Sequence, residues 1–220
     1  MARLKIAVLI SGRGSNMQAL VEACATRDGP AEIALVLSNV PDAAGLKFAE
    51  QNGIPTVAID HRQFPGRESF EQKINSCLID AKIELVCLAG FMRLLTAGFV
   101  DTWRDRLINI HPSLLPAFKG LDTHARVIAE GARFSGCTVH FVRSDMDSGP
   151  IIIQAAVPVA LDDDADSLAR RVLEAEHRIY PQALRLIAEG RVRVENDLVR
   201  IEGARTPVSS VINPDIGLDG

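Results

Sequence analysis

The N-terminal half of the chain alternates short apolar runs with segments of helical periodicity. The apolar runs are unbroken and rich in Val, Ile and Leu, and they are KIAVLI (5–10), EIALVLSN (32–39), PTVAI (55–59), ELVCLAG (84–90) and RLINI (106–110). Strands buried on both faces of a parallel sheet have this composition. The segments with helical periodicity are 15–25, 43–52 and 68–81. Strands alternating with helices predict an α/β fold with a doubly wound, mostly parallel sheet.

The C-terminal half predicts a different arrangement. The runs GCTVHFV (136–142) and IIIQAAVPV (151–159) are strand-like and flank the turn-prone loop RSDMDSGP, so we expect an antiparallel portion. Helical patterns cover 123–130 and 165–189, and Gly190 is expected to end the second helix. A hairpin near Asn196 follows. We predict a single domain over 1–203 and a poorly ordered tail over 204–220.

Composition narrows the classes of function. The 220 residues, 47% of them hydrophobic, can bury one core, and the net charge of -4 comes without a basic tract. Neither a nucleic acid nor a membrane surface is therefore expected as a partner. The apolar run before Ser11 is too short for a signal peptide or a membrane span, which predicts a cytoplasmic protein. The cysteines Cys24, Cys77, Cys87 and Cys137 lack CxxC spacing, so reduced thiols and no metal site are expected.

The turn LISGRGSN (9–16) joins the first strand to the first helix. Backbone N–H groups at a helix N-terminus can hold a phosphate, and Gly12 and Gly14 let the backbone approach one. Met17 and Asn39 stand where a dinucleotide fold needs glycine and an acidic residue, and no GK[ST] occurs. A site for one phosphate, such as that of a phosphoribosyl group, remains. The alternative is a tight turn in which Ser15 or Asn16 caps the helix.

The strand 106–110 leads into NIHPSLLP, a second candidate site. Asn109 and His111 share a face of the strand, at the carboxyl edge where ligands of open α/β sheets bind. An amide that donates to an oxyanion and an imidazole that transfers protons suit addition to a carbonyl. A carboxylate should hold the imidazole, and the residues leave Asp145 and Asp147 open. The alternative interpretation is a polar strand end beside a surface turn.

The other histidines are expected to contribute less than His111 to the chemistry of the site. His140 lies on a predicted strand. It is expected to lie near the site, behind the residues that would contact the reacting groups. His124, His61 and His177 are expected to be surface or packing residues. No GxSxG occurs and no cysteine lies in an electropositive turn, so covalent catalysis is not indicated.

Six motifs together resemble the folate-dependent phosphoribosylglycinamide formyltransferases. In chain order they are LISGRGSN, LAGFMRLL, NIHPSLLPAFKG, GCTVHFV, DMDSGPIIIQ and EAEHRIYP. The resemblance extends to about residue 203 and implies a Rossmann-like formyltransferase fold. The chain departs from the family pattern at Ala117, Phe118, Lys119 and Asp122, in a segment where family members vary.

The resemblance implies a reaction and a catalytic trio. The family transfers a formyl group from 10-formyltetrahydrofolate, a cosubstrate, to the amine of N1-(5-phospho-D-ribosyl)glycinamide in de novo purine (IMP) biosynthesis, without a metal. By position, Asn109, His111 and Asp147 match its catalytic residues. Asn109 would hold the formyl oxygen, His111 would donate a proton, and Asp147 would favour the charged imidazole and assist proton shuttling through a tetrahedral intermediate.

The resemblance also implies the binding residues. Gly14, Ser15, Asn16 and Glu176 match the ribonucleotide site, so the N-terminal half would bind the phosphoribosyl group. The C-terminal half would contribute to the folate site. The residues that match the folate site are Arg67, Met92, Arg93, Leu94, Leu95 and Asn109. The expected partners are these two small molecules, and the protein would be a monomer or a homodimer.

Three alternatives compete with the transferase. A formyltetrahydrofolate hydrolase would use similar residues, but such hydrolases carry an additional N-terminal domain, and here the first strand begins at Lys5. A transferase acting on initiator methionyl-tRNA would need a further C-terminal domain and a basic surface. A non-catalytic phosphosugar-binding module would not need the trio Asn109, His111 and Asp147.

Overall fold

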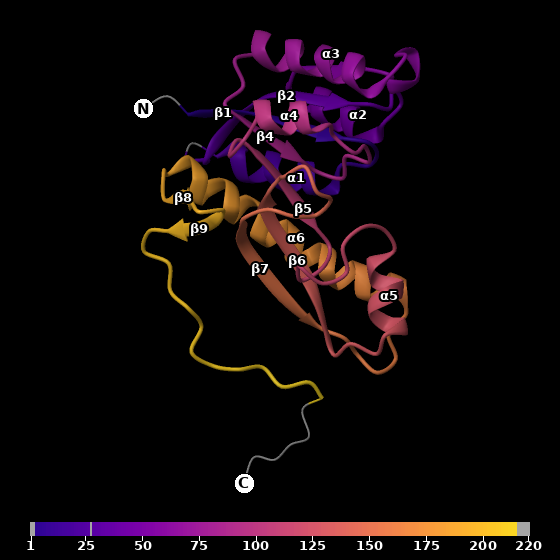
Figure 1. Ribbon diagram of the computed structural model, residues 1–220, viewed down its shortest axis with the longest axis vertical. Coiled ribbons are helices and arrows are strands. Elements are labelled where there is room, and N and C mark those ends of the chain that lie inside the picture. The colour runs from indigo at the N-terminus through magenta and orange to yellow at the C-terminus, as the bar shows by residue number, and fades with distance from the viewer. Residues whose placement is uncertain (1–2, 27, 215–220) are drawn as a thin grey trace.

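The computed structural model describes residues 3–26 and 28–214, which form a seven-stranded sheet with helices on both faces (Figure 1). The strand order is β3-β2-β1-β4-β5-β6-β7. Strands β1 to β5 run parallel, whereas β6 is antiparallel to β5 and β7. The doubly wound fold with an antiparallel C-terminal portion is therefore confirmed. The bounds are β1 Leu4–Ile10, β2 Ala31–Ser38, β3 Thr56–Ala58, β4 Leu85–Leu88, β5 Leu107–His111, β6 Phe134–Phe141 and β7 Ile151–Pro158.

The helices divide into two layers, each with its own core. Helices α1, α2, α5 and α6 pack on one face of the sheet, and α3 and α4 pack on the other. A short 3-10 helix, η1, precedes α3. The bounds are α1 Ser15–Ala25, α2 Ala44–Gln51, η1 His61–Gln63, α3 Arg67–Asp80, α4 Ala97–Thr102, α5 Thr123–Ala129 and α6 Ala165–Ala188.

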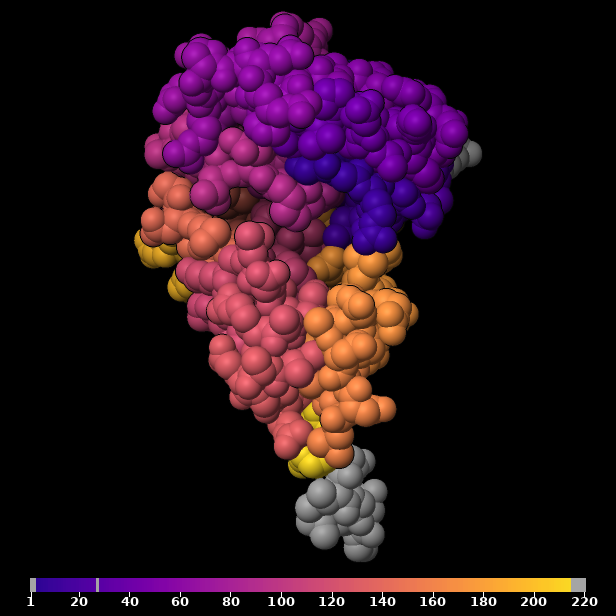
Figure 2. Space-filling model, turned by 90° about the vertical axis from the view of Figure 1, so that its right-hand side faces the viewer, coloured from indigo at the N-terminus to yellow at the C-terminus, as the bar shows by residue number. Residues whose placement is uncertain are grey.

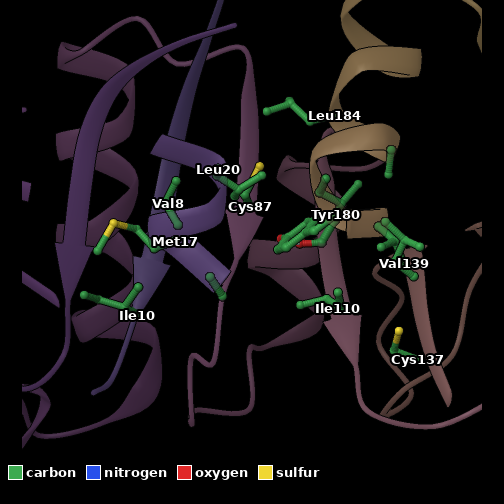
Figure 3. Close-up of a cluster of buried hydrophobic side chains, with 14 of the residues drawn as sticks. Val8, Ile10, Met17, Leu20, Cys87, Ile110, Cys137, Val139, Tyr180 and Leu184 are labelled. Atoms are coloured by element: carbon green, nitrogen blue, oxygen red, sulfur yellow. The ribbon is translucent and has the colours of Figure 1, made fainter. Parts of the chain in front are cut away.

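Burial on both faces explains the unbroken apolar runs. On β1, Val8 and Ile10 enter the core beneath α1 and α6, whereas Leu9 enters the core beneath α3 and α4. Figure 3 shows the first of these cores, with Tyr180 of α6 among side chains of α1 and the sheet. The Tyr180 hydroxyl donates to the Leu88 carbonyl (2.8 Å), which satisfies its polar atom at the centre of the core. Helix α6 is thereby tied to β4, next to the carboxyl edge of the sheet.

Two local features differ from the sequence prediction. The periodicity did not predict α4, which Thr96 caps by accepting a hydrogen bond from the Phe99 N–H (3.3 Å). The alternative in which Ser15 or Asn16 caps α1 is wrong, because the N-cap residue is Gly14. Its left-handed backbone (φ 72°) and missing side chain leave the first N–H groups of α1 without a side-chain acceptor. That arrangement suits a helix whose N-terminus receives a ligand.

The predicted hairpin is present and is tied to the sheet. Strands β8 (Val192–Glu195) and β9 (Leu198–Ile201) pair antiparallel around a turn at 196–197. Arg143, which follows β6, donates to Asp197 in that turn (2.6 Å) and to Asp105 (2.8 Å). Within the described part of the tail, 204–214, no helix or strand forms, and the rest of the predicted tail, 215–220, lies outside the described residues. Among the described helices, none has the length and apolarity that a membrane span requires.

Candidate active site

The candidate site lies where the strand order reverses, at the carboxyl edge of β1, β4 and β5. Ligands of open α/β sheets bind at such a switch point. The Ser11 N–H donates to the Gly90 carbonyl (3.1 Å), and the Ser11 hydroxyl donates to Asn39 Oδ1 (2.5 Å) while accepting from the Met92 N–H (2.8 Å). Sequence reasoning missed this role of Ser11 and Asn39. Figure 2 shows the surface hollowed between the magenta segment near residue 90 and the salmon segment near residues 110–130.

The structure brings Asn109, His111 and Asp147 together. Asn109 and His111 lie on β5, and the loop between β6 and β7 places Asp147 Oδ2 3.4 Å from His111 Nδ1. Asp145, the other candidate, is exposed. The geometry therefore pairs His111 with Asp147 and resolves the alternative that the loop sequence left open.

Both ring nitrogens of His111 face oxygen acceptors. Nδ1 faces the Asp147 carboxylate and Nε2 lies 2.9 Å from the Phe118 carbonyl oxygen. A ring with protons on both nitrogens satisfies both contacts, whereas either neutral tautomer sets a lone pair against an oxygen. Both side chains are largely buried (7% and 14% exposed), so their attraction is screened less than on the surface. The site suits a histidine that holds and donates a proton.

The loop between β5 and α5 contacts both members of this pair. The Phe118 carbonyl accepts from His111, and the Gly120 N–H donates to Asp147 Oδ2 (2.7 Å). Asp147 has a left-handed backbone (φ 46°), which is strained for a residue with a side chain. Strain of this kind is commonly found at functional sites. The hydrogen bond from Gly120 helps to hold the carboxylate in place beside the imidazole.

Asn109 lies opposite His140 of β6. The two residues are paired across the antiparallel strands, and Asn109 Nδ2 lies 3.3 Å from His140 Nε2. His140 is 1% exposed, and burial lowers the pKa of its ring. The structure confirms the expectation that His140 lies near the site.

The predicted ribonucleotide residues meet at the start of α1. The Asn16 side-chain amide donates to Glu176 Oε2 (2.7 Å), which joins α1 to α6. Glu176 is 6% exposed, and burial raises the pKa of its carboxyl group to about 7, although the Asn16 hydrogen bond opposes this shift. A buried carboxylate without a cationic partner is costly, so this position is suited to a ligand that supplies donors.

A cavity of about 350 Å³ lies between α1 and α6, and neither Asn16 nor Glu176 is among its lining residues. Its lining includes Ser15 of the glycine turn and His177, which follows Glu176 in the sequence. His177 Nε2 is buried without a hydrogen-bond partner among the described residues, and burial lowers the pKa of the ring. His177 was expected to be a surface or packing residue, and it is half-buried.

Four of the predicted folate residues, 92–95, follow β4 in the sequence and are arranged unevenly. Met92 and Leu94 are exposed (67% and 60%), Arg93 is half-buried, and Leu95 packs against the core under α3 and α4. The Met92 N–H already donates to Ser11, so this main-chain donor is not free for a ligand. Arg67 is exposed at the start of α3, and the described hydrogen bonds and ion pairs do not link it to this run.

The described residues contain no group of three or more His, Cys, Asp or Glu side chains that could hold a metal ion. The four cysteines are free, and Cys24, Cys87 and Cys137 are buried. Burial raises the pKa of the Cys137 thiol to about 12, which keeps it protonated and unreactive.

Comparisons with known proteins indicate the family of the chain. The family model described as Formyl transferase matches residues 4–184. The trifunctional purine biosynthetic protein adenosine-3 of Gallus gallus is 49% identical over 192 residues, which are 87% of this chain and 19% of that protein. The chain thus spans about a fifth of such relatives. The phosphoribosylglycinamide formyltransferase of Haemophilus influenzae is 40% identical over 209 residues, which are 95% of this chain and 99% of that protein.

Solved structures give the same result. Glycinamide ribonucleotide transformylase 1 from Symbiobacterium toebii superposes with a TM-score of 0.88 at 45% identity, over 90% of this chain and 94% of that one. A formyltetrahydrofolate deformylase from Pseudomonas putida superposes with a TM-score of 0.80 at 26% identity, over 90% of this chain and 70% of that one. With most of its length matched by the family model and by a full-length relative, the chain belongs to the formyl transferase family and, within it, to the phosphoribosylglycinamide formyltransferases.

Proposed function

We propose that this chain transfers the formyl group of 10-formyltetrahydrofolate to the amine of N1-(5-phospho-D-ribosyl)glycinamide. The products are formylglycinamide ribonucleotide and tetrahydrofolate, in de novo purine biosynthesis. The observation that carries the proposal is the pairing of His111 with Asp147 beside Asn109, at the carboxyl edge of the sheet. These groups provide an oxyanion donor, a proton donor and an orienting carboxylate.

The proposed reaction proceeds by direct attack. The amine nitrogen forms a bond to the formyl carbon, and the carbonyl becomes a tetrahedral oxyanion that an Asn109 N–H stabilises. His111 donates a proton to the folate nitrogen as the bond from that nitrogen to the formyl carbon breaks. The neutral imidazole then takes the extra proton from the attacking nitrogen, which returns His111 to its starting state. Asp147 orients the imidazole and stabilises its charged form. No covalent enzyme intermediate is needed.

The binding residues divide between the two substrates. The turn around Gly14 and Ser15 would hold the phosphate on the N-terminal N–H groups of α1, and Glu176 would accept hydrogen bonds from hydroxyl groups of the ribonucleotide. The exposed side chains of Met92 and Leu94 would form an apolar wall for the folate. The N-terminal half of a single domain would thus bind the ribonucleotide, while the loops from the C-terminal half complete the folate side.

A formyltetrahydrofolate hydrolase is the second candidate function, since a deformylase shares the fold. Water would replace the amine at the same carbon. One feature supports the transferase: the buried Glu176 beside the start of α1, which hydrolysis would not require.

One assay separates the candidates. The purified protein is incubated with 10-formyltetrahydrofolate, with and without the ribonucleotide, and tetrahydrofolate release is followed. We expect release only when the ribonucleotide is present, with formylglycinamide ribonucleotide formed in equal amount. Release that is independent of the ribonucleotide would establish the hydrolase, and binding without any release would establish a non-catalytic module.

A further inference from the structure

His140 faces Asn109 from the neighbouring strand, and this contact reaches the group expected to hold the formyl oxygen. The register of β5 and β6 sets the two residues directly opposite each other, so their side chains share a face of the sheet. Asn109 Nδ2 and His140 Nε2 are 3.3 Å apart. His140 is buried on this face (1% exposed), and the contact is therefore largely shielded from water.

The other ring nitrogen of His140 has unambiguous partners. Nδ1 lies 3.0 Å from the Phe141 carbonyl oxygen and 3.1 Å from the Ser148 carbonyl oxygen. Carbonyl oxygens only accept hydrogen bonds, so Nδ1 carries a proton. The Ser148 carbonyl belongs to the loop that carries Asp147, and the ring therefore also anchors that loop.

The contact with Asn109 then fixes the state of the ring. An amide nitrogen only donates, so Nε2 must offer its lone pair and the ring is neutral. Burial lowers the pKa of His140, which agrees with this state. The titratable groups that face the ring act in opposite directions, since Asp147 favours a charged ring and His111 disfavours it.

The neutral ring restricts the Asn109 amide in turn. If the amide turned over, its oxygen would face the lone pair of Nε2, and the hydrogen bond would be lost. One of the two amide N–H groups of Asn109 is used by His140, and the second is left for the site. We propose that His140, neutral and protonated at Nδ1, is a positioning residue that aims the second Asn109 N–H at the formyl oxygen. This inference rests on the proposed formyl transfer.

Two substitutions test the contacts of the two ring nitrogens of His140 separately. In H140N the new amide lies near the position of Nδ1, so it can still donate to the two carbonyls but offers nothing to Asn109. In H140Q the longer side chain can reach the position of Nε2 and can accept from Asn109, but it loses the Nδ1 contacts. Val139→Ala, a buried residue next in the strand, is the control for loosening of β6.

The kinetic test measures kcat and KM for each variant. An oxyanion donor is worth about a hundredfold to a thousandfold in kcat, so we expect H140N to lose roughly tenfold to a hundredfold with little change in the KM for the ribonucleotide. H140Q should retain more activity than H140N, and V139A should keep kcat within about threefold while its melting temperature falls. The opposite order, with H140N more active than H140Q, would assign the ring to loop anchoring alone and overturn the proposal.

A double-mutant cycle and a spectroscopic measurement complete the test. In an N109A background, H140N should cost less than about twofold, because the group that it positions is gone. A loss as large as in the wild-type background would overturn the proposal. Nitrogen NMR of the labelled ring should show a neutral His140 protonated at Nδ1 at pH 7, and a cationic ring or the Nε2 tautomer would contradict it. The NMR result does not depend on activity, so it separates failure of this inference from failure of the proposed function.

Discussion

Asp147 and Glu176 are the two carboxylates of the site, and their surroundings differ. Asp147 faces the His111 ring and accepts a hydrogen bond from the Gly120 N–H. Glu176 is more deeply buried, and its described hydrogen-bond partner is the neutral Asn16 amide. A carboxylate beside an imidazole can stabilise a proton in transit, whereas a buried carboxylate without a cation is disfavoured until a ligand supplies donors. The difference predicts a catalytic end and a binding end of the proposed site.

Removing the imidazole at the catalytic end should have the largest effect. We expect His111→Ala to lower kcat by about a hundredfold to ten-thousandfold, the range of general acid-base contributions. The dissociation constant of the ribonucleotide, measured by calorimetry, should change less than about threefold, because Asn16 and Glu176 are untouched. A variant with wild-type kcat would remove His111 from the mechanism.

At the binding end the effect should fall on affinity. Glu176→Gln removes a charged acceptor, and hydrogen bonds to charged groups contribute about 1.5 to 3 kcal/mol. We expect the KM for the ribonucleotide to rise about tenfold to a hundredfold, with kcat within about threefold, in steady-state assays at pH 8. Glu174→Gln, on the exposed side of the same helix, is the matched control and should leave both constants unchanged. If E176Q lowered kcat alone, the two ends of the site would not be separate.

Stability should reveal the cost of burying the Glu176 carboxylate. The folded-state pKa of Glu176, about 7, lies above its ordinary value of 4.5, so the folded state binds more protons between these values. Its contribution to the free energy of unfolding is present below about pH 4.5 and is lost as the pH rises through about 7. We expect E176Q to gain up to roughly 3 kcal/mol over wild type at pH 8 and little at pH 4.5, by urea unfolding. An equal difference at both pH values would contradict the raised pKa.

The smallest effect is expected from the glycine turn. A Cβ atom at Gly12 would meet nothing within 4 Å, so Gly12→Ala should fold normally and crowd only a bound phosphate. We expect the KM for the ribonucleotide to rise about threefold to tenfold, on the scale of 1 kcal/mol. Gly98→Ala, at another position with space for a methyl group, should leave the KM unchanged. Unaltered affinity in G12A would place the phosphate elsewhere.

The structure also changes how the other glycine of the turn should be tested. From the sequence, Gly14→Val is expected to weaken ribonucleotide binding by crowding the phosphate. Gly14 has φ 72°, and a Cβ atom there would lie 2.9 Å from Met17 Cε and 3.3 Å from Gly45 Cα. The substitution would therefore disturb the start of α1 itself, and lost binding in that variant would not report on the phosphate.

Much of the fold could be predicted because burial on both sheet faces leaves a strong pattern. The runs that became β1 to β5 are rich in Val, Ile and Leu and do not alternate, and the face shared by Asn109 and His111 follows from strand geometry. Helix α4 has only six residues, too few for a clear periodic signal, and its local signs were the cap at Thr96 and the helical spacing of Phe99 and Trp103. The sequence pattern thus reports packing well and short elements poorly.

The candidate site was less predictable because loops build it. The choice between Asp145 and Asp147 depends on how the loop after β6 turns, and the residues alone left it open. The contacts of Phe118 with His111 and of Gly120 with Asp147 depend on a loop backbone that no periodicity describes. The hydrogen bond between Asn16 and Glu176 joins helices 160 positions apart in the chain.

The pairing of His111 with Asp147 is tested most directly by the turnover of Asp147→Asn at saturating concentrations of both substrates. The neutral amide has nearly the shape of the carboxylate, so the geometry is kept while the charge beside the imidazole is removed. We expect kcat to fall by about a hundredfold or more, whereas Asp145→Asn, an exposed carboxylate in the same loop, should stay within about threefold of wild type. Wild-type turnover in D147N, or an equal loss in D145N, would contradict the assignment of Asp147 as the partner of the catalytic histidine.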